Sequence, residues 1–184
     1  MEIHGGNGYV LDQFLQSNAN SRTDAYRLTT MDLVLELARL TQALEKAGLD
    51  YALCGGLALA VYARPRATLD IDLMVEPAAL DRIQKTVKPL GFTIAALPMR
   101  FQGGAVQIQR LTKIDPATGE HLALDLLLVT PETQASWDGR IAVEWEGGAL
   151  KVLSPKGLIS LKYLRNSGKD QDDIDYLSGL LHED

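Results

Sequence analysis

The stretch that decides the fold reads LCGGLALAVYAR at residues 53–64 and continues as RATLDID at residues 66–72. Residues 50–54 form a short apolar run that ends in Gly55 and Gly56, which predicts a strand entering a tight turn. Residues 57–63 are rich in helix formers and stop before Pro65, because the residue preceding a proline is disfavoured in the helical region. The pattern predicts a strand, a glycine turn, a short helix and a second strand over residues 69–75.

Asp70 and Asp72 lie two residues apart on the second predicted strand, so their side chains point to the same face. Two carboxylates side by side repel each other, and a protein tolerates this best where a cation lies between them. Hard oxygen ligands favour Mg²⁺ or Mn²⁺ over zinc. An Asp-x-Asp pair alone is also common on solvent-facing strands, so the pair needs further support.

Asp125 provides that support, because it lies inside the apolar run LALDLLLV at residues 122–129. A charge in the middle of a buried strand is costly unless it is paired or bound to a metal. The alternatives are a salt bridge to a lysine or arginine, or an edge strand on which Asp125 faces water. We favour a metal site formed by Asp70, Asp72 and Asp125, and we expect the three carboxylates to converge with at least one raised pKa.

The remaining pattern predicts helices before and after a group of strands in the sequence, which a mixed sheet with helices on one face would satisfy. Leucines at helical spacing follow Asp32 until Gly48, and Pro77 begins a helix that ends at Gly91. Hairpins are expected over residues 106–129 and 140–153, followed by helices over 155–166 and 171–181. The predicted class is α/β (α+β), a mixed β-sheet flanked by helices with a C-terminal helical pair. We divide the chain into a polar N-terminal arm (1–28), a core (29–154) and a C-terminal helical segment packed on the core (155–184).

Composition restricts the possible environments and partners. The chain has 184 residues, of which 46% are hydrophobic and 23% charged, as in globular proteins. A single cysteine, the lack of a long apolar run and the lack of a signal-peptide pattern predict a cytoplasmic protein without a membrane partner. The formal net charge of −6 disfavours long-range attraction to nucleic acid.

Any anionic ligand must therefore be held by local cations, and one stretch of the chain offers them. Between Gly147 and Lys169 there is no acidic residue, whereas five basic residues occur there: Lys151, Lys156, Lys162, Arg165 and Lys169. A solvated helix face is the alternative interpretation of this stretch.

These motifs, in this order, resemble the signature of the DNA polymerase β-type nucleotidyltransferase superfamily. That signature is a Gly-Gly or Gly-Ser turn, a helix, and then Asp-x-Asp on the next strand. The string RATLDID at residues 66–72 and the lysine-aspartate pattern of Lys162, Lys169, Asp170 and Asp173 are similar to the AbiEii/AbiGii-type toxin branch. The resemblance covers roughly residues 32–181 and implies a mixed sheet of the nucleotidyltransferase type.

The resemblance implies roles for particular residues. Gly55 and Gly56, with Arg66, Lys162 and Lys169, would bind the nucleotide. Asp70 and Asp72 would bind both metal ions, Mg²⁺ or Mn²⁺, and Asp125 the catalytic one. Lys162 and Asp170 would also be needed for activity. We expect Lys162 to point toward Asp70 and Asp72, and Asp170 to cap the last helix while facing the site.

The activity that the resemblance implies is transfer of a nucleoside monophosphate from a nucleoside triphosphate to an acceptor. An RNA end or a protein hydroxyl are the acceptors of interest, and the chain could be the toxin of a toxin-antitoxin system with a cognate antitoxin as partner. The alternative is a catalytically weak nucleotide-binding or regulatory, antitoxin-like module of the same fold. Gly56 stands where many active relatives carry serine, which favours that alternative.

Overall fold

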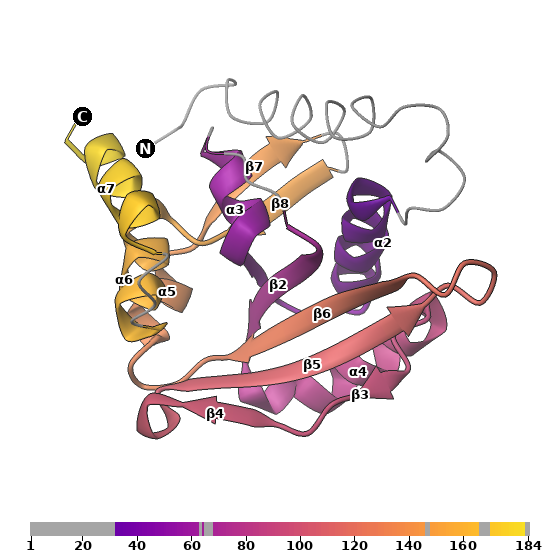
Figure 1. The fold of residues 1–184 in the computed structure, drawn as a ribbon. Coiled ribbons are helices and arrows are strands. Elements are labelled where there is room, and N and C mark those ends of the chain that lie inside the picture. Colours follow the sequence, from indigo (N-terminus) through magenta and orange to yellow (C-terminus); the bar gives the residue numbers. More distant parts are fainter. Residues whose placement is uncertain (1–31, 63, 65–67, 146–147, 166–169, 183–184) are drawn as a thin grey trace.

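The computed structural model describes residues 32–62, 64, 68–145, 148–165 and 170–182 (Figure 1). The predicted N-terminal arm, Arg66 and Lys169 lie outside the described residues. The helices are α2 (Leu33–Lys46), α3 (Gly55–Val61), α4 (Leu80–Val87), α5 (Gln134–Asp138), α6 (Pro155–Arg165) and α7 (Gln171–Leu180). The strands are β1 (Ala52–Cys54), β2 (Asp70–Val75), β3 (Ile94–Ala95), β4 (Met99–Phe101), β5 (Val106–Ile114), β6 (His121–Leu128), β7 (Ile141–Trp145) and β8 (Gly148–Val152).

The strands of the described part of the chain form one mixed sheet of eight, in the order β3-β5-β6-β2-β1-β8-β7, with β4 also pairing with β5. β2 runs parallel to β6, and β1 runs parallel to β8. The other neighbouring strands are antiparallel. The predicted mixed sheet flanked by helices is confirmed.

One face of the sheet packs against α2. Ile71 on β2, Leu124 on β6 and Leu111 on β5 lie opposite one another in register and are all buried. Lys113, two residues after Leu111 and therefore on the same face, donates to Glu36 of α2 at 2.8 Å. Asp70, Asp72 and Asp125 alternate with these residues, so they lie on the opposite face of the sheet.

The start of α2 follows directly from its sequence. The side chain of Asp32 accepts hydrogen bonds from the backbone amides of Val34 and Leu35 at 3.0 and 3.1 Å, which satisfies two free donors of the first turn. Leu37, Leu40 and Leu44 then lie on one stripe and are fully buried.

The helix expected between Pro77 and Gly91 is interrupted at both ends. Its α-helical part is α4, which is preceded by a 3₁₀ turn at Pro77–Ala79 and followed by another at Lys88–Leu90. Pro89 lacks the amide hydrogen that would continue the α-helical pattern, which accounts for the tighter turn there. The short elements α5 and β4 were not predicted.

The C-terminal helices α6 and α7 pack against each other at one end of the molecule (Figure 1). Their bounds are close to the predicted ones. Among the described helices, none combines the length and the apolar character needed to cross a membrane.

Candidate metal centre

The candidate site lies along one row of residues that crosses the sheet. Asp72 on β2 is in register with Asp125 on β6 and with Cys54 on β1, and Asp125 is in register with Arg110 on β5. Residues directly opposite each other on neighbouring strands point to the same face. The pairing of four strands therefore places in one line the guanidinium of Arg110, the carboxylates of Asp125 and Asp72, and the thiol of Cys54. Asp70 lies two residues before Asp72 on β2.

The three aspartates converge as expected from the sequence. One oxygen from each of Asp70, Asp72 and Asp125 lies within 4.8 Å of the oxygens of the other two. β6 lies between β5 and β2 in the sheet. The alternative that Asp125 faces water from an edge strand is therefore wrong.

The other alternative for Asp125, a salt bridge, is present in the structure. Arg110 donates from Nε to Oδ1 and from a terminal nitrogen to Oδ2 of Asp125, each at 2.6 Å. The Asp125 side chain is 7% exposed and that of Arg110 is 41% exposed. The hydrogen bonds to Asp125 and the negative charges of the three aspartates raise the pKa of Arg110. Asp125 is thus both a paired carboxylate and a member of the cluster.

The carboxyl group of Asp72 is difficult to ionise within the cluster. Burial, and then the charges of Asp70 and Asp125, raise its pKa from 3.8 to about 7. The positive charges of Arg165 and Arg110 act in the opposite direction. The sequence predicted at least one raised pKa among the three carboxylates, and this prediction is confirmed.

Cys54 is not a suitable metal ligand in this setting. Its side chain is fully buried. Burial, followed by the charge of Asp72, raises the pKa of the thiol well above its usual value, so sulfur stays protonated. The donor set facing a ligand is therefore composed of carboxylate oxygens, and it suits Mg²⁺ or Mn²⁺.

The glycine turn packs directly against the carboxylates. Gly55 has a φ of +65°, and a Cβ atom placed on it would lie 1.9 Å from Oδ2 of Asp72. A Cβ on Gly56 would lie 2.9 Å from Cβ of Thr68, whose hydroxyl donates to Oδ1 of Asp70 at 2.6 Å. Both glycines are needed to let the turn approach β2 this closely, and Thr68 fills the space beside Gly56.

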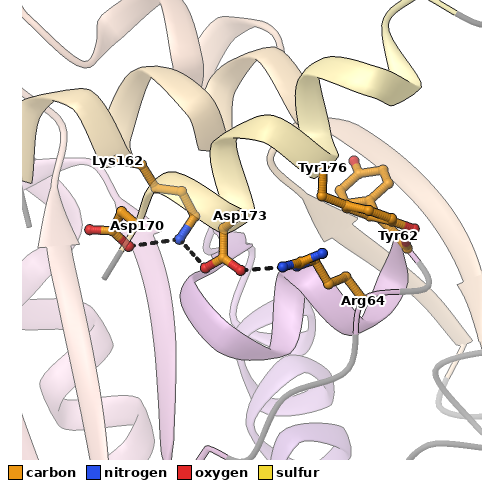
Figure 2. A network of polar contacts seen from close by, with 6 residues as sticks. All are labelled: Tyr62, Arg64, Lys162, Asp170, Asp173 and Tyr176. Atoms are coloured by element: carbon orange, nitrogen blue, oxygen red, sulfur yellow. Dashed lines mark hydrogen bonds and ion pairs between the residues drawn. The ribbon is translucent and has the colours of Figure 1, made fainter. Parts of the chain in front are cut away.

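Lys162 does not have the free ammonium group that the sequence interpretation required. Figure 2 shows its Nζ between two carboxylates of the C-terminal segment, at 2.9 Å from Asp170 Oδ1 and 2.7 Å from Asp173 Oδ2. Asp173 also accepts from Nε of Arg64 at 3.2 Å, and Arg64 lies over the Tyr176 ring. The expected orientation of Lys162 toward Asp70 and Asp72 is therefore replaced by an ion-pair network that joins α6 and α7 to Arg64, which follows α3.

Asp170 differs from its prediction in the same way. It occupies the N-cap position of α7, but its side chain makes no capping hydrogen bond. Its Oδ1 accepts from Lys162 instead, and the residue is 5% exposed. A part in the chemistry for Lys162 and Asp170 stays a prediction.

The sequence analysis missed Arg110 and Thr68 as residues of the site, and it named Arg165 only as one of five local cations. For Arg110 a signal existed, because the turn at residues 115–119 fixes the register of the hairpin and places Arg110 opposite Asp125. For Thr68 and Arg165 no such local rule applies. The position of Thr68 depends on how α3 returns to β2, and the effect of Arg165 depends on how α6 packs.

Comparisons with known sequences give a limited result. No family model matches the chain. The flavin oxidoreductase hxnT of Emericella nidulans is 77% identical over 26 residues, which are 14% of this chain and 7% of that protein. A 12-oxophytodienoate reductase of Oryza sativa subsp. japonica is 62% identical over 26 residues, 8% of its length. The chain thus spans less than a tenth of these curated relatives, and so short a match does not transfer their activity.

Comparisons of structure cover most of the chain. The antibiotic-resistance factor ANT(2'')-Ia superposes with a TM-score of 0.54 at 15% identity, over 80% of this chain and 83% of that one. Its crystal structure with adenylyl-2''-tobramycin gives the same TM-score at 14% identity, over 82% and 90%. A Thermotoga maritima protein described as a nucleotidyltransferase gives 0.52 at 15% identity, over 82% and 93%. At these identities the likeness concerns the fold, and the chain has the fold of these nucleotidyltransferases.

Proposed function

We propose that the protein is a nucleotidyltransferase that transfers a nucleoside monophosphate from a nucleoside triphosphate to an acceptor hydroxyl. The observation that carries the proposal is the cluster of Asp70, Asp72 and Asp125, whose oxygens lie within 4.8 Å of one another beside the Gly55 turn. The fold shared with known nucleotidyltransferases supports it.

The three carboxylates would hold Mg²⁺ or Mn²⁺. The bound ions would activate the acceptor hydroxyl and neutralise the leaving group. The acceptor oxygen attacks the α-phosphorus, a new P–O bond forms, the bond from the α-phosphorus to the bridging oxygen breaks, and pyrophosphate leaves. Asp125 is a poor base for this step, since Arg110 already donates to both of its oxygens. The hydroxyl proton would have to pass to another group or to solvent.

Gly55 and Gly56 would let the triphosphate approach the backbone of the turn. Free backbone amides in such a turn can donate to phosphate oxygens. The lack of side chains lets the turn lie directly against Asp72 and Thr68, which brings these amides close to the carboxylates. Arg165 would act near the phosphates, because its charge already acts on Asp72 and its side chain is exposed.

The test is an incubation with each nucleoside triphosphate, Mg²⁺, and either total cellular RNA or total protein. We expect label from the α-phosphate to enter one of the two fractions and label from the γ-phosphate to enter neither. Asp70→Asn and Asp72→Asn should abolish labelling, whereas Asp81→Asn, at an exposed position of α4, should leave it unchanged. Transfer of the γ-phosphate, or labelling that survives both substitutions, would contradict the proposal.

The fraction that gains label identifies the acceptor class. A toxin role further requires that expression stops growth, that Asp70→Asn removes this effect, and that a cognate antitoxin restores growth to the wild type. Nucleoside triphosphate binding without transfer to either fraction would favour the alternative of a regulatory module that keeps the fold.

A further inference from the structure

We propose that Arg110 is a positioning residue of the metal centre, which holds Asp125 in the orientation needed to bind a divalent cation. This inference rests on the proposed function. Arg110 lies opposite Asp125 on the neighbouring strand, and its two donors bind both carboxylate oxygens at 2.6 Å. A planar guanidinium that binds both oxygens fixes the plane of the carboxylate as well as its position.

The pairing leaves Asp125 able to bind a cation. An ionised carboxylate has about four lone-pair sites, of which two accept from Arg110. The remaining sites can serve the ion shared with Asp70 and Asp72. The oxygens of the three carboxylates already lie within 4.8 Å of one another while the Arg110 pair is formed, so the pair does not have to open for them to converge.

The charge balance points in the same direction. Arg110 offsets one of the three aspartate charges, and Arg165 also acts on Asp72, yet the cluster keeps a net negative charge that attracts a divalent cation. Without Arg110, Asp125 would be a nearly buried carboxylate beside two others of the same sign. Arg110 therefore stabilises the arrangement of carboxylates before any ion binds, and its half-exposed side chain does so from the rim of the site.

The test is the affinity for Mn²⁺ measured by calorimetry and by electron paramagnetic resonance at about pH 8, because metal ligands must be deprotonated to bind the ion. Arg110→Met should weaken Mn²⁺ binding about 10-fold to 100-fold, as is typical when a partner of a metal ligand is lost. Arg110→Lys keeps the charge but loses the two-pronged geometry, so it should weaken binding by a smaller factor. Arg100→Met, at an exposed position on the adjacent strand β4, is the matched control and should bind like wild type.

A double substitution separates positioning from general stabilisation. If Arg110 acts through Asp125, adding Arg110→Met to Asp125→Asn should cause no further loss of Mn²⁺ affinity. A purely structural role would lower the unfolding temperature of Arg110→Met and leave its Mn²⁺ affinity unchanged, which would overturn the inference. Tighter binding by Arg110→Met would also overturn it, because Arg110 would then be a competitor of the ion.

Three further outcomes keep the test decisive. If Arg110→Met does not fold, Arg110→Lys carries the comparison, and wild-type affinity in that variant would contradict the positioning role. If wild-type protein binds no Mn²⁺ while it is folded, the proposed function fails, and the inference falls with it. Wild-type binding that is lost in Asp70→Asn but unchanged in Arg110→Met would leave the proposed function standing and refute the inference alone.

Discussion

At the scale of single residues, Gly55 links the backbone of the turn to the chemistry of the site. Its φ of +65° is unfavourable for residues with a Cβ, and a Cβ there would lie 1.9 Å from Oδ2 of Asp72. Gly48 has a similar φ of +62° but no atom within 4 Å of its Cβ position. Comparing substitutions at Gly48 and Gly55 therefore separates the effect of backbone strain from the effect of displacing a carboxylate.

We predict that Gly48→Ala and Gly55→Ala both lower the free energy of unfolding, by about 1 kcal/mol for the backbone conformation alone. Gly55→Ala should lose more, because Asp72 must move, and it should also lose Mn²⁺ affinity. Urea denaturation and Mn²⁺ titration of both variants check this. Equal Mn²⁺ affinities in the two variants would show that the close approach of Gly55 has no part in the site.

Asp72 should give the protein without metal a characteristic pH dependence. Its pKa is about 7 in the folded state, above the ordinary value of 3.8. The unfolded chain therefore releases this proton first as pH rises, and the free energy of unfolding falls between about pH 4 and about pH 7. The stabilising contribution is complete below pH 3.8 and is lost as pH passes through the folded-state pKa.

We expect Asp72→Asn to remove this fall, so that the variant is more stable than wild type at about pH 8 in the presence of a chelator. Asp81→Asn is the control and should follow the wild-type curve. Urea denaturation at several pH values measures the effect. A wild-type curve that is flat over this interval, or a fall that persists in Asp72→Asn, would contradict the assigned pKa.

At the scale of elements, the network centred on Lys162 fastens the two C-terminal helices. The Lys162 side chain is 8% exposed and those of Asp170 and Asp173 are both 7% exposed. Tyr176 of α7 adds a hydrogen bond from its hydroxyl to the carbonyl oxygen of Tyr62 at 2.6 Å (Figure 2). The contacts join α6 to α7, and α7 to the segment that follows α3.

We predict that Lys162→Met lowers the free energy of unfolding by about 3 kcal/mol or more, because it leaves buried carboxylates without their cation. Lys156→Met, on an exposed turn of the same helix, should have almost no effect. Urea denaturation measures both. If Lys162→Met keeps wild-type stability and instead loses nucleotide binding, Lys162 serves the ligand, as the family resemblance implies.

Much of the element pattern is predictable because it is encoded locally. The hydrogen-bonding side chain of Asp32, the leucine stripe after it and the turn around residues 115–119 each have a short-range cause. The alternation around Asp70 and Asp72 likewise identifies their shared face. Two-residue and three-residue strands such as β3 and β4 exist only through pairing with β5, so their own sequences carry little signal.

The roles of polar residues were harder to predict than the elements. Lys162 and Asp170 had the right types and spacing for a ligand site, but the packing of α6 on α7 brings them to each other. Asp125 had three competing interpretations: the edge strand is wrong, the salt bridge to Arg110 is present, and the metal role stays a prediction. Such outcomes depend on which elements pack together, which is not visible in the residues themselves.

At the scale of the whole molecule, the fold assembles the site from distant parts of the chain. The parallel pairing of β2 with β6 joins Asp72 to Asp125, and the hairpin of β5 and β6 adds Arg110. The net charge of −6 is spread over the chain, whereas the cations that act on Asp72 are local. The molecule as a whole repels polyanions. The proposed binding of a triphosphate would therefore depend on these local cations and on bound metal ions.

The most direct measurement of the central claim is a crystal structure of the protein with Mn²⁺ and a non-hydrolysable nucleoside triphosphate analogue, with anomalous scattering data to locate manganese. We predict an anomalous peak within coordination distance of Asp70, Asp72 and Asp125, with the phosphates of the analogue beside the Gly55 turn. Arg110 should still bind Asp125 in that complex. A manganese peak or an analogue located away from these three carboxylates would contradict the account.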